Sequence, residues 1–186
     1  MTALVRVRDV IIFVGLMWGI FFLNWAFSGS LNNYGLLPRS VYGLPGIITS
    51  PFLHADYSHI ISNSIPILIM GSFVALEGKW RFWIVTGAIG LIGGGLVWLV
   101  GRYSMHIGAS GVVYGLFAYV LGRAWWQRNF ASILLAVVVL VLYSGYIASL
   151  FIPRTGISFE GHLFGFLSGG LVAYVSWKRE KPRRKA

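Results

Sequence analysis

Residues 82–100 read FWIVTGAIGLIGGGLVWLV, a stretch of nineteen consecutive residues without a charged side chain. A helix needs about 20 predominantly apolar residues to cross a hydrocarbon core that is roughly 30 Å thick. This stretch therefore predicts a membrane-spanning helix. The composition agrees, because 57% of the 186 residues are hydrophobic and only 11% are charged. A soluble domain of this length needs far more polar surface.

Five further apolar runs have near-spanning length, at about 10–27, 58–76, 107–122, 130–152 and 161–177. The first follows Arg6 and Arg8 and faintly resembles a signal peptide. No small-residue cleavage site stands out after Phe27, so we expect a retained membrane anchor. The fourth and sixth runs are short and glycine-rich, which is typical of helices buried among other helices. The sequence thus predicts an all-α polytopic membrane protein, a bundle of six transmembrane helices within residues 10–177.

The net charge of +10 would suggest nucleic-acid binding in a soluble protein, but here the cations lie between and after the apolar runs. With six spans, both termini lie on one side of the membrane. Placing residues 1–9 and 178–186 in the cytoplasm puts twelve cations inside and three outside, a strong bias of the expected sign. The twelve are Arg6, Arg8, Lys79, Arg81, Arg123, Arg128, Lys178, Arg179, Lys181, Arg183, Arg184 and Lys185, and the three are Arg39, Arg102 and Arg154. We expect no nucleic-acid partner.

The long connection 28–57 is predicted to lie outside. It is too apolar for a solvated linker, since it contains Leu36-Leu37-Pro38 and Leu44-Pro45-Gly46-Ile47-Ile48, so we expect it to be structured and partly embedded at the interface. The basic tail 178–186 is expected to be attracted to anionic lipid. The chain has no cysteine, which excludes disulfides and thiolate metal sites.

Polar groups within the spans are costly to place in a bilayer, so each is a candidate functional residue. The first cluster opens the second span and contains His54, His59 and Asn63. His59 and Asn63 are four residues apart and therefore share one helix face. The cluster is also compatible with a polar helix entry bonded to backbone. No acidic residue or cysteine completes a convincing metal-ligand set, and we expect neither a metal nor a cofactor.

The second cluster opens the fourth span with Gly108-Ala109-Ser110-Gly111. A serine hydroxyl is a weak nucleophile and needs a base within hydrogen-bonding reach. Small neighbours would let a substrate carbonyl approach, and the start of a helix supplies free N–H groups that stabilise an oxyanion. Taken alone, the same segment with Gly115 is equally compatible with ordinary small-residue helix packing.

The third cluster opens the sixth span and contains His162 beside glycines that recur every four residues, at positions 161, 165 and 169. This spacing predicts a smooth groove that could receive the small-residue face of the fourth span. Ser110 lies 13 residues before Arg123, and His162 lies 16 before Lys178. At 1.5 Å per residue these are rises of roughly 20 and 24 Å, so the two side chains are expected at similar depth.

Taken together, the three clusters resemble the rhomboid intramembrane serine proteases. The resemblance rests on three motifs in the family's order: His54-x4-His59-x3-Asn63, Gly108-Ala109-Ser110-Gly111 and Gly161-His162-x2-Gly165-x3-Gly169. Each motif is weak alone, but the three in register are specific. The resemblance covers nearly the whole chain, because six spans is the basic bacterial form of the family.

The resemblance implies that Ser110 is the nucleophile and His162 the general base and then acid, in a dyad without a carboxylate. His59 and Asn63, with the backbone N–H of Ser110, would form the oxyanion hole. Tyr114, one turn after Ser110, would pack against the His162 ring. The remaining motif positions would support the site: His54, Gly108, Gly111, Gly161 and Gly165.

Other residues near these motifs are given no catalytic role. Asp56 and Glu160 are interpreted as interface residues, and His106 matches no motif position. The family often carries a Trp-Arg pair in the first external loop, where this chain has Leu37-Pro38-Arg39 instead. The structure of that loop is therefore not implied by the resemblance.

The function implied is hydrolysis of peptide bonds in or near the transmembrane helices of protein substrates. The site would open to the external side of a bacterial cytoplasmic membrane, with both termini in the cytoplasm. The alternative is a catalytically inactive rhomboid-like protein that binds membrane helices, although such relatives typically lack the serine or the histidine. A small transporter or channel would want charged residues along a path through the membrane, and here the polar groups stop in the outer third.

Overall fold

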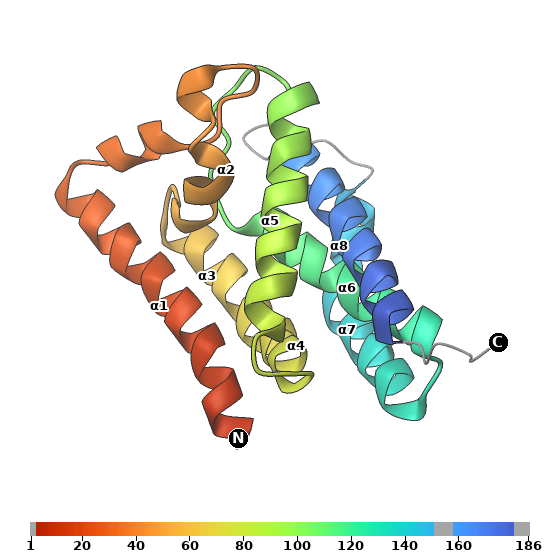
Figure 1. The fold of residues 1–186 in the computed structure, drawn as a ribbon. Coiled ribbons are helices and arrows are strands. Elements are labelled where there is room, and N and C mark those ends of the chain that lie inside the picture. The colour runs from red at the N-terminus through yellow and green to blue at the C-terminus, as the bar shows by residue number, and fades with distance from the viewer. Residues whose placement is uncertain (1–2, 151–157, 181–186) are drawn as a thin grey trace.

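The computed structural model describes residues 3–150 and 158–180, and this part of the chain is a bundle of helices (Figure 1). It contains no β-strand among the described residues, and its one isolated bridge joins Leu36 to His106. The long helices are α1 (Ala3–Ala26), α5 (Arg81–Val100), α6 (Ser110–Gln127), α7 (Phe130–Ser149) and α8 (Phe159–Glu180). One further helical segment runs through α3 (Tyr57–Pro66), the π-helical turn η4 (Ile67–Gly71) and α4 (Ser72–Leu76).

Four helical segments are long and apolar enough to cross a membrane: Arg6–Ala26, Tyr57–Leu76, Arg81–Val100 and Phe130–Ala148. They confirm the predicted all-α polytopic membrane fold. The predicted fourth and sixth spans, α6 and α8, do not reach this hydropathy. In α6, ten residues between Val112 and Arg123 are buried in the protein, so this helix needs little lipid-facing apolar surface. That α6 and α8 also cross the bilayer stays a prediction.

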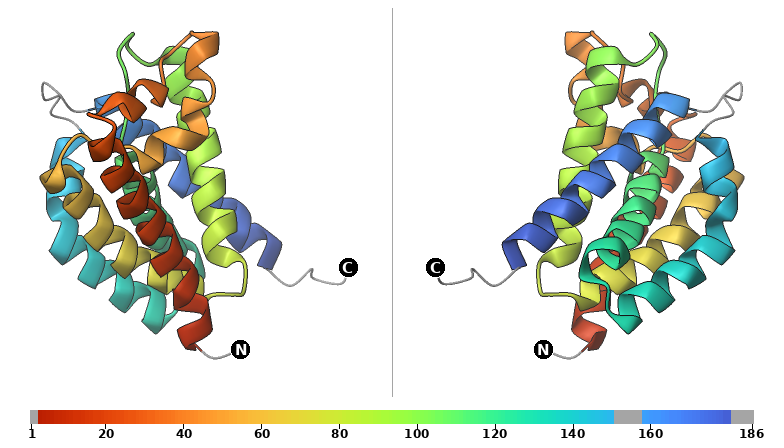
Figure 2. Two further views of the ribbon diagram at one scale, coloured as in Figure 1. Left: turned by 90° about the vertical axis from the view of Figure 1, so that its left-hand side faces the viewer. Right: turned by 90° about the vertical axis from the view of Figure 1, so that its right-hand side faces the viewer.

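The centre of the bundle is the contact between α6 and α8, the most extensive helix pair in the structure. Figure 2 (right) shows α8 crossing in front of α5, and α8 also contacts α6, which in turn contacts α7. Glycines make this approach possible, because a Cβ on Gly165 would meet the backbone oxygen of Gly111, and one on Gly169 would meet that of Gly115. The two glycine faces expected from the sequence therefore lie against each other.

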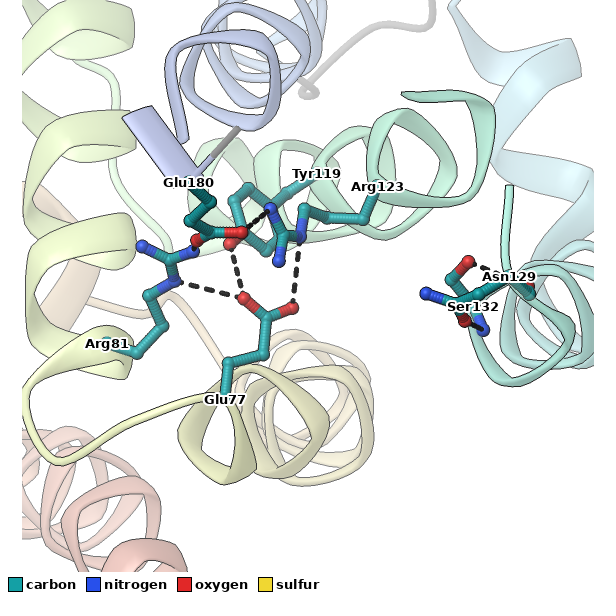
Figure 3. Close-up of polar contacts among 7 residues, drawn as sticks. All are labelled: Glu77, Arg81, Tyr119, Arg123, Asn129, Ser132 and Glu180. Carbon is teal, nitrogen blue, oxygen red and sulfur yellow. Dashed lines mark hydrogen bonds and ion pairs between the residues drawn. The ribbon is translucent and has the colours of Figure 1, made fainter. Parts of the chain in front are cut away.

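One end of the bundle is tied by a charged cluster, shown in Figure 3. Glu77 accepts hydrogen bonds from Tyr119 Oη (2.7 Å) and Arg81 Nε (3.0 Å), and its second oxygen lies 3.5 Å from Arg123 Nε. Glu180 at the end of α8 pairs with Arg123 Nη1 (2.7 Å) and with Arg81. This Glu77 end joins the C-terminal ends of α4, α6 and α8 to the start of α5. Two of the cations predicted to face the cytoplasm are thus partners in internal ion pairs.

The opposite end, where α6 begins at Ser110, is covered by the segment between α1 and α3. This segment folds into short helical turns: η1 (Ser30–Tyr34), η2 (Val41–Gly43), α2 (Gly46–Thr49) and η3 (Ser50–Phe52). Arg39 fastens it to the end of α5, because its N–H donates to Trp98 O (2.9 Å) and its guanidinium to Gly101 O (2.6 Å). The indole N–H of Trp98 donates in return to Ser40 O at 2.9 Å. Arg39 therefore anchors the loop without a Trp-Arg pair.

Several helix ends differ from the predicted span boundaries. Helix α6 begins at Ser110 rather than at 107, because Gly108 has φ +107° and breaks the helical path. At their other ends, α6 continues to Gln127 and α8 to Glu180, and α1 already begins at Ala3 within the predicted N-terminal segment 1–9. The predicted residues 151–152, the external Arg154 and residues 181–186 of the basic tail lie outside the described residues.

The glycine contact between α6 and α8 predicts a sharp difference between two neighbouring positions. A Cβ at Gly169 would collide with backbone, whereas one at Gly170 has nothing within 4 Å. Gly169→Ala is therefore expected to lower the free energy of unfolding by about 1–3 kcal/mol, the usual cost of overpacking. The matched control Gly170→Ala is expected to leave it unchanged or slightly raised, because alanine favours helix. Denaturant titration in detergent checks both, and equal effects at the two positions would contradict the contact.

Candidate active site

A cavity of about 560 Å³ lies at the Ser110 end of the bundle. Its wall includes five of the residues singled out from the sequence: His59, Asn63, Ser110, Tyr114 and His162. They come from α3, α6 and α8, so the fold gathers positions that are distant in the chain. Because the wall contains hydroxyl, amide and imidazole groups, the cavity can hold water and a polar backbone, unlike an apolar lipid crevice.

Ser110 is the first residue of α6 and directly follows a turn whose shape depends on Gly108. Gly108 has φ +107°, and its N–H donates to Ser50 O at 2.8 Å. A Cβ on Gly108 would also collide with the His59 ring, so glycine is needed here for both conformation and space. The N–H groups of the first turn of a helix have no acceptor within that helix. The turn therefore presents Ser110 together with free N–H donors at its own backbone and that of Gly111.

His162 lies in the first turn of α8 and is buried. Its ring stacks on Tyr114, with centroids 4.1 Å apart and planes inclined by 11°. Tyr114 stacks in turn on Tyr146 of α7, at 4.7 Å and 20°. The Tyr114 and Tyr146 rings, from two other helices, thus restrict the orientation of the His162 imidazole. The described residues include no hydrogen bond between the Ser110 and His162 side chains, and such bonds often form only when substrate is bound.

His59 and Asn63 are positioned by the first turn of α3. Asp56 caps this helix by accepting the His59 N–H at 2.8 Å. The Asn63 amide nitrogen donates to His59 O at 2.9 Å, which leaves its second hydrogen available to the cavity. The His59 ring lies over Gly108, close to the turn that carries Ser110. Both residues therefore lie on the cavity wall, near the start of α6.

His54 lies behind this wall and is only 1% exposed. Its Nε2 faces the Ala109 N–H at 3.4 Å, and its ring packs against His59 with centroids 5.0 Å apart. Burial, followed by the neighbouring His59, lowers the pKa of His54 from 6.5 to about 4. The ring is therefore neutral at neutral pH and can accept the Ala109 N–H. His54 supports the turn before Ser110 and is not itself part of the cavity wall.

The two acidic residues near the site are engaged in structural contacts. Asp56 is the cap of α3, and Glu160 pairs with Arg102, whose N–H donates to the carboxylate at 3.2 Å. Neither carboxylate is bonded to His162 among the described contacts. That neither residue is catalytic stays a prediction.

The cavity wall also includes residues to which the sequence motifs assign no role, among them His106, Ser158 and Tyr146. Ser158 accepts the Gly161 N–H at 3.0 Å and so caps α8. Serine is common at the position just before a helix, where its oxygen accepts an N–H of the first turn. The capping role of Ser158 could therefore be predicted from the sequence. Tyr146 carries no such signal, because its contact with Tyr114 depends on how α7 packs on α6.

Comparison with known proteins gives the same family as the motifs. The family model described as Rhomboid domain matches residues 39–179. An uncharacterized protein of Mycobacterium tuberculosis is 33% identical over 187 aligned residues, which cover 95% of this chain and 76% of the relative. An uncharacterized protein of Mycobacterium leprae is 32% identical over 184 residues, covering 94% and 73%.

A relative from Bacillus subtilis carries the name "Putative rhomboid protease YdcA". It is 29% identical over 146 residues, which cover 74% of this chain and 69% of that protein. The matched family model spans the helices from α3 to α8 that surround the cavity and most of the covering loop. The chain belongs to the rhomboid family of membrane proteins.

Proposed function

We propose that this protein is an intramembrane serine endopeptidase that cleaves membrane-protein substrates in or near their transmembrane helices. One observation carries the proposal: Ser110 and His162 line the same polar cavity from the first turns of two helices in close backbone contact. Membership of the rhomboid family, many of whose members are proteases of this kind, supports it. The proposed dyad needs no third, acidic residue, because the Tyr114 stack orients the His162 ring.

In the proposed mechanism, the Ser110 hydroxyl attacks the carbonyl carbon of the scissile peptide bond while His162 takes its proton. The resulting tetrahedral intermediate collapses when the C–N bond breaks, and His162 passes the proton to the leaving amine. An ester between Ser110 and the new carboxyl end remains. Water then attacks this ester and gives one proton to His162, which returns a proton to the Ser110 oxygen as the ester C–O bond breaks. The carboxylic acid product leaves and releases its remaining proton to solvent.

The oxyanion of each intermediate is proposed to be stabilised by donors at the start of α6. The backbone N–H of Ser110 and the second amide hydrogen of Asn63 are the donors of the required type, and His59 stands beside them. Removal of one oxyanion-hole donor typically lowers kcat by about 10²–10³-fold. Asn63 already donates to His59 O, which holds its amide group in place.

The proposed substrate enters from the membrane and must unwind locally to present its carbonyl. The cavity at the Ser110 end supplies the water that hydrolysis needs and that the hydrocarbon core excludes. We propose that this end faces the external side of the membrane and that both termini are cytoplasmic. The gathering of Arg81 and Arg123 at the opposite end supports this orientation. The basic tail is proposed to bind anionic lipid.

A catalytically inactive relative that binds membrane helices is a weaker candidate for this chain. Such a protein would have no reason to keep a serine and a histidine on the wall of one cavity with a ring stack that orients the histidine. The structure therefore favours the enzyme.

Ser110→Ala is expected to abolish cleavage of a model single-span substrate in liposomes, because no other serine is proposed to attack the peptide. The matched control is Ser104→Ala, which changes an exposed serine of the loop before α6 and is expected to cleave at the normal rate. Product formation is followed by gel and mass spectrometry. Undiminished cleavage by the Ser110 variant would refute the assignment of the nucleophile.

His54 predicts a pH dependence of stability. Its pKa is about 4 in the folded protein and 6.5 ordinarily, so the unfolded chain binds more protons between these values. The free energy of unfolding therefore falls as the pH drops from 6.5 to about 4, by up to about 1.4 kcal/mol per pH unit from this residue. His54→Gln keeps an acceptor for Ala109 but does not titrate, so it is expected to show a shallower decline in denaturant titrations. Identical pH slopes for the variant and the natural protein would contradict a neutral, buried His54.

A further inference from the structure

His106 is a buried histidine on the wall of the active-site cavity, and the proposed chemistry does not use it. Its ring makes two polar contacts. Nδ1 lies 2.6 Å from the Ser158 hydroxyl, and Nε2 lies 3.1 Å from the backbone oxygen of Arg102. The backbone of His106 also exchanges two hydrogen bonds with Leu36, at 2.8 and 2.9 Å. The ring is thus held from two sides, and its main chain is fixed to the covering loop.

These contacts decide the tautomer of the His106 ring. A carbonyl oxygen can only accept, so Nε2 carries the hydrogen that is donated to Arg102 O. Burial lowers the pKa of His106, so the ring is neutral and its Nδ1 is an acceptor. The Ser158 hydroxyl therefore donates to Nδ1, and its oxygen accepts the Gly161 N–H at 3.0 Å. A directed chain of hydrogen bonds leads from Gly161 through Ser158 to His106.

This chain of hydrogen bonds joins the two halves of the proposed dyad. His106 stands four residues before Ser110, in the loop that ends at the nucleophile. Ser158 stands four residues before His162, and its carbonyl oxygen accepts the His162 N–H at 3.1 Å. The charged pair of Arg102 with Glu160 joins the same loop to the same helical turn. The glycine contacts fix the spacing of α6 and α8 within the bundle, and the His106–Ser158 bond fixes it at the active-site end.

We infer that His106 is a positioning residue that holds the first turn of α8, and with it His162, in register with Ser110 through the Ser158 hydroxyl. The inference rests on the proposed function, because it assigns a role within the same dyad. His106 does not exchange protons with the substrate in this scheme. Its contribution is the neutral imidazole acceptor that orients Ser158.

The first test is the rate at which a fluorophosphonate probe labels Ser110, measured beside the thermal unfolding temperature in detergent. His106→Leu is expected to label about 10–100-fold more slowly per folded molecule, since a displacement of about 1 Å in a catalytic group costs up to about 10² in rate. His106→Gln keeps one donor and one acceptor and is expected to recover most of the rate. The control Tyr103→Phe, an exposed position in the same loop, is expected to label normally.

The second test asks whether His106 acts through Ser158. If it does, the double variant His106→Leu with Ser158→Ala labels no more slowly than Ser158→Ala alone. The Ser158 change has already removed the hydrogen bond through which His106 acts, so the His106 change has no further effect. Losses that multiply would overturn the proposed route, as would equal labelling rates for His106→Leu and the natural protein. Failure of the natural protein itself to label would instead refute the proposed function.

A third measurement does not depend on the reactivity of Ser110, and it distinguishes a local effect of His106→Leu from a general loss of folding. Hydrogen–deuterium exchange in the Ser110→Ala background is expected to show faster exchange at residues 159–163 for His106→Leu than for His106→Gln, with the Glu77 end unchanged. Uniformly faster exchange throughout the bundle would overturn the local role of His106.

Discussion

The close backbone contact between α6 and α8 is the constraint on which the proposed site depends. Gly165 lies against the carbonyl of Gly111, and Gly169 against that of Gly115, so no side chain separates the two helices. Because Ser110 and His162 lie in the first turns of these same helices, the distance between them depends on how the helices pack. Side chains larger than hydrogen along this contact would push the two first turns apart. The glycine spacing therefore bears on the proposed catalytic geometry as well as on the fold.

The two ends of the bundle are held by different chemistry. At the Glu77 end, a cluster of ion pairs with Arg123 and Glu180 joins four helices. At the Ser110 end, the Arg102–Glu160 pair joins the loop before α6 to α8, and ring stacks hold the site, including the contact of His162 with Tyr114. The acidic side chain of the cavity wall, Asp56, caps α3. The proposed dyad therefore has no carboxylate bonded to His162 among the described contacts.

Much of this arrangement could be predicted from the sequence, because it depends on local spacing. Uncharged runs predict helices, and glycines every four residues predict the face that α8 turns toward α6. The His106–Ser158 bond could not be predicted, since its partners are 52 residues apart and meet only after the loops fold. Arg39 is a similar case, because its contact with Gly101 joins residues that are 62 positions apart in the chain. The predicted start of α6 lies three residues before the observed one, since the left-handed conformation of Gly108 cannot be recognised from composition.

The most direct test of the dyad is to identify by mass spectrometry which residue a fluorophosphonate probe modifies. The probe reacts only with a serine that a base activates, so it reports the pairing of Ser110 with His162 without any choice of substrate. A single adduct on Ser110 is expected in the natural protein, and none after His162→Ala. An adduct on another serine, or an undiminished Ser110 adduct after His162→Ala, would contradict the dyad.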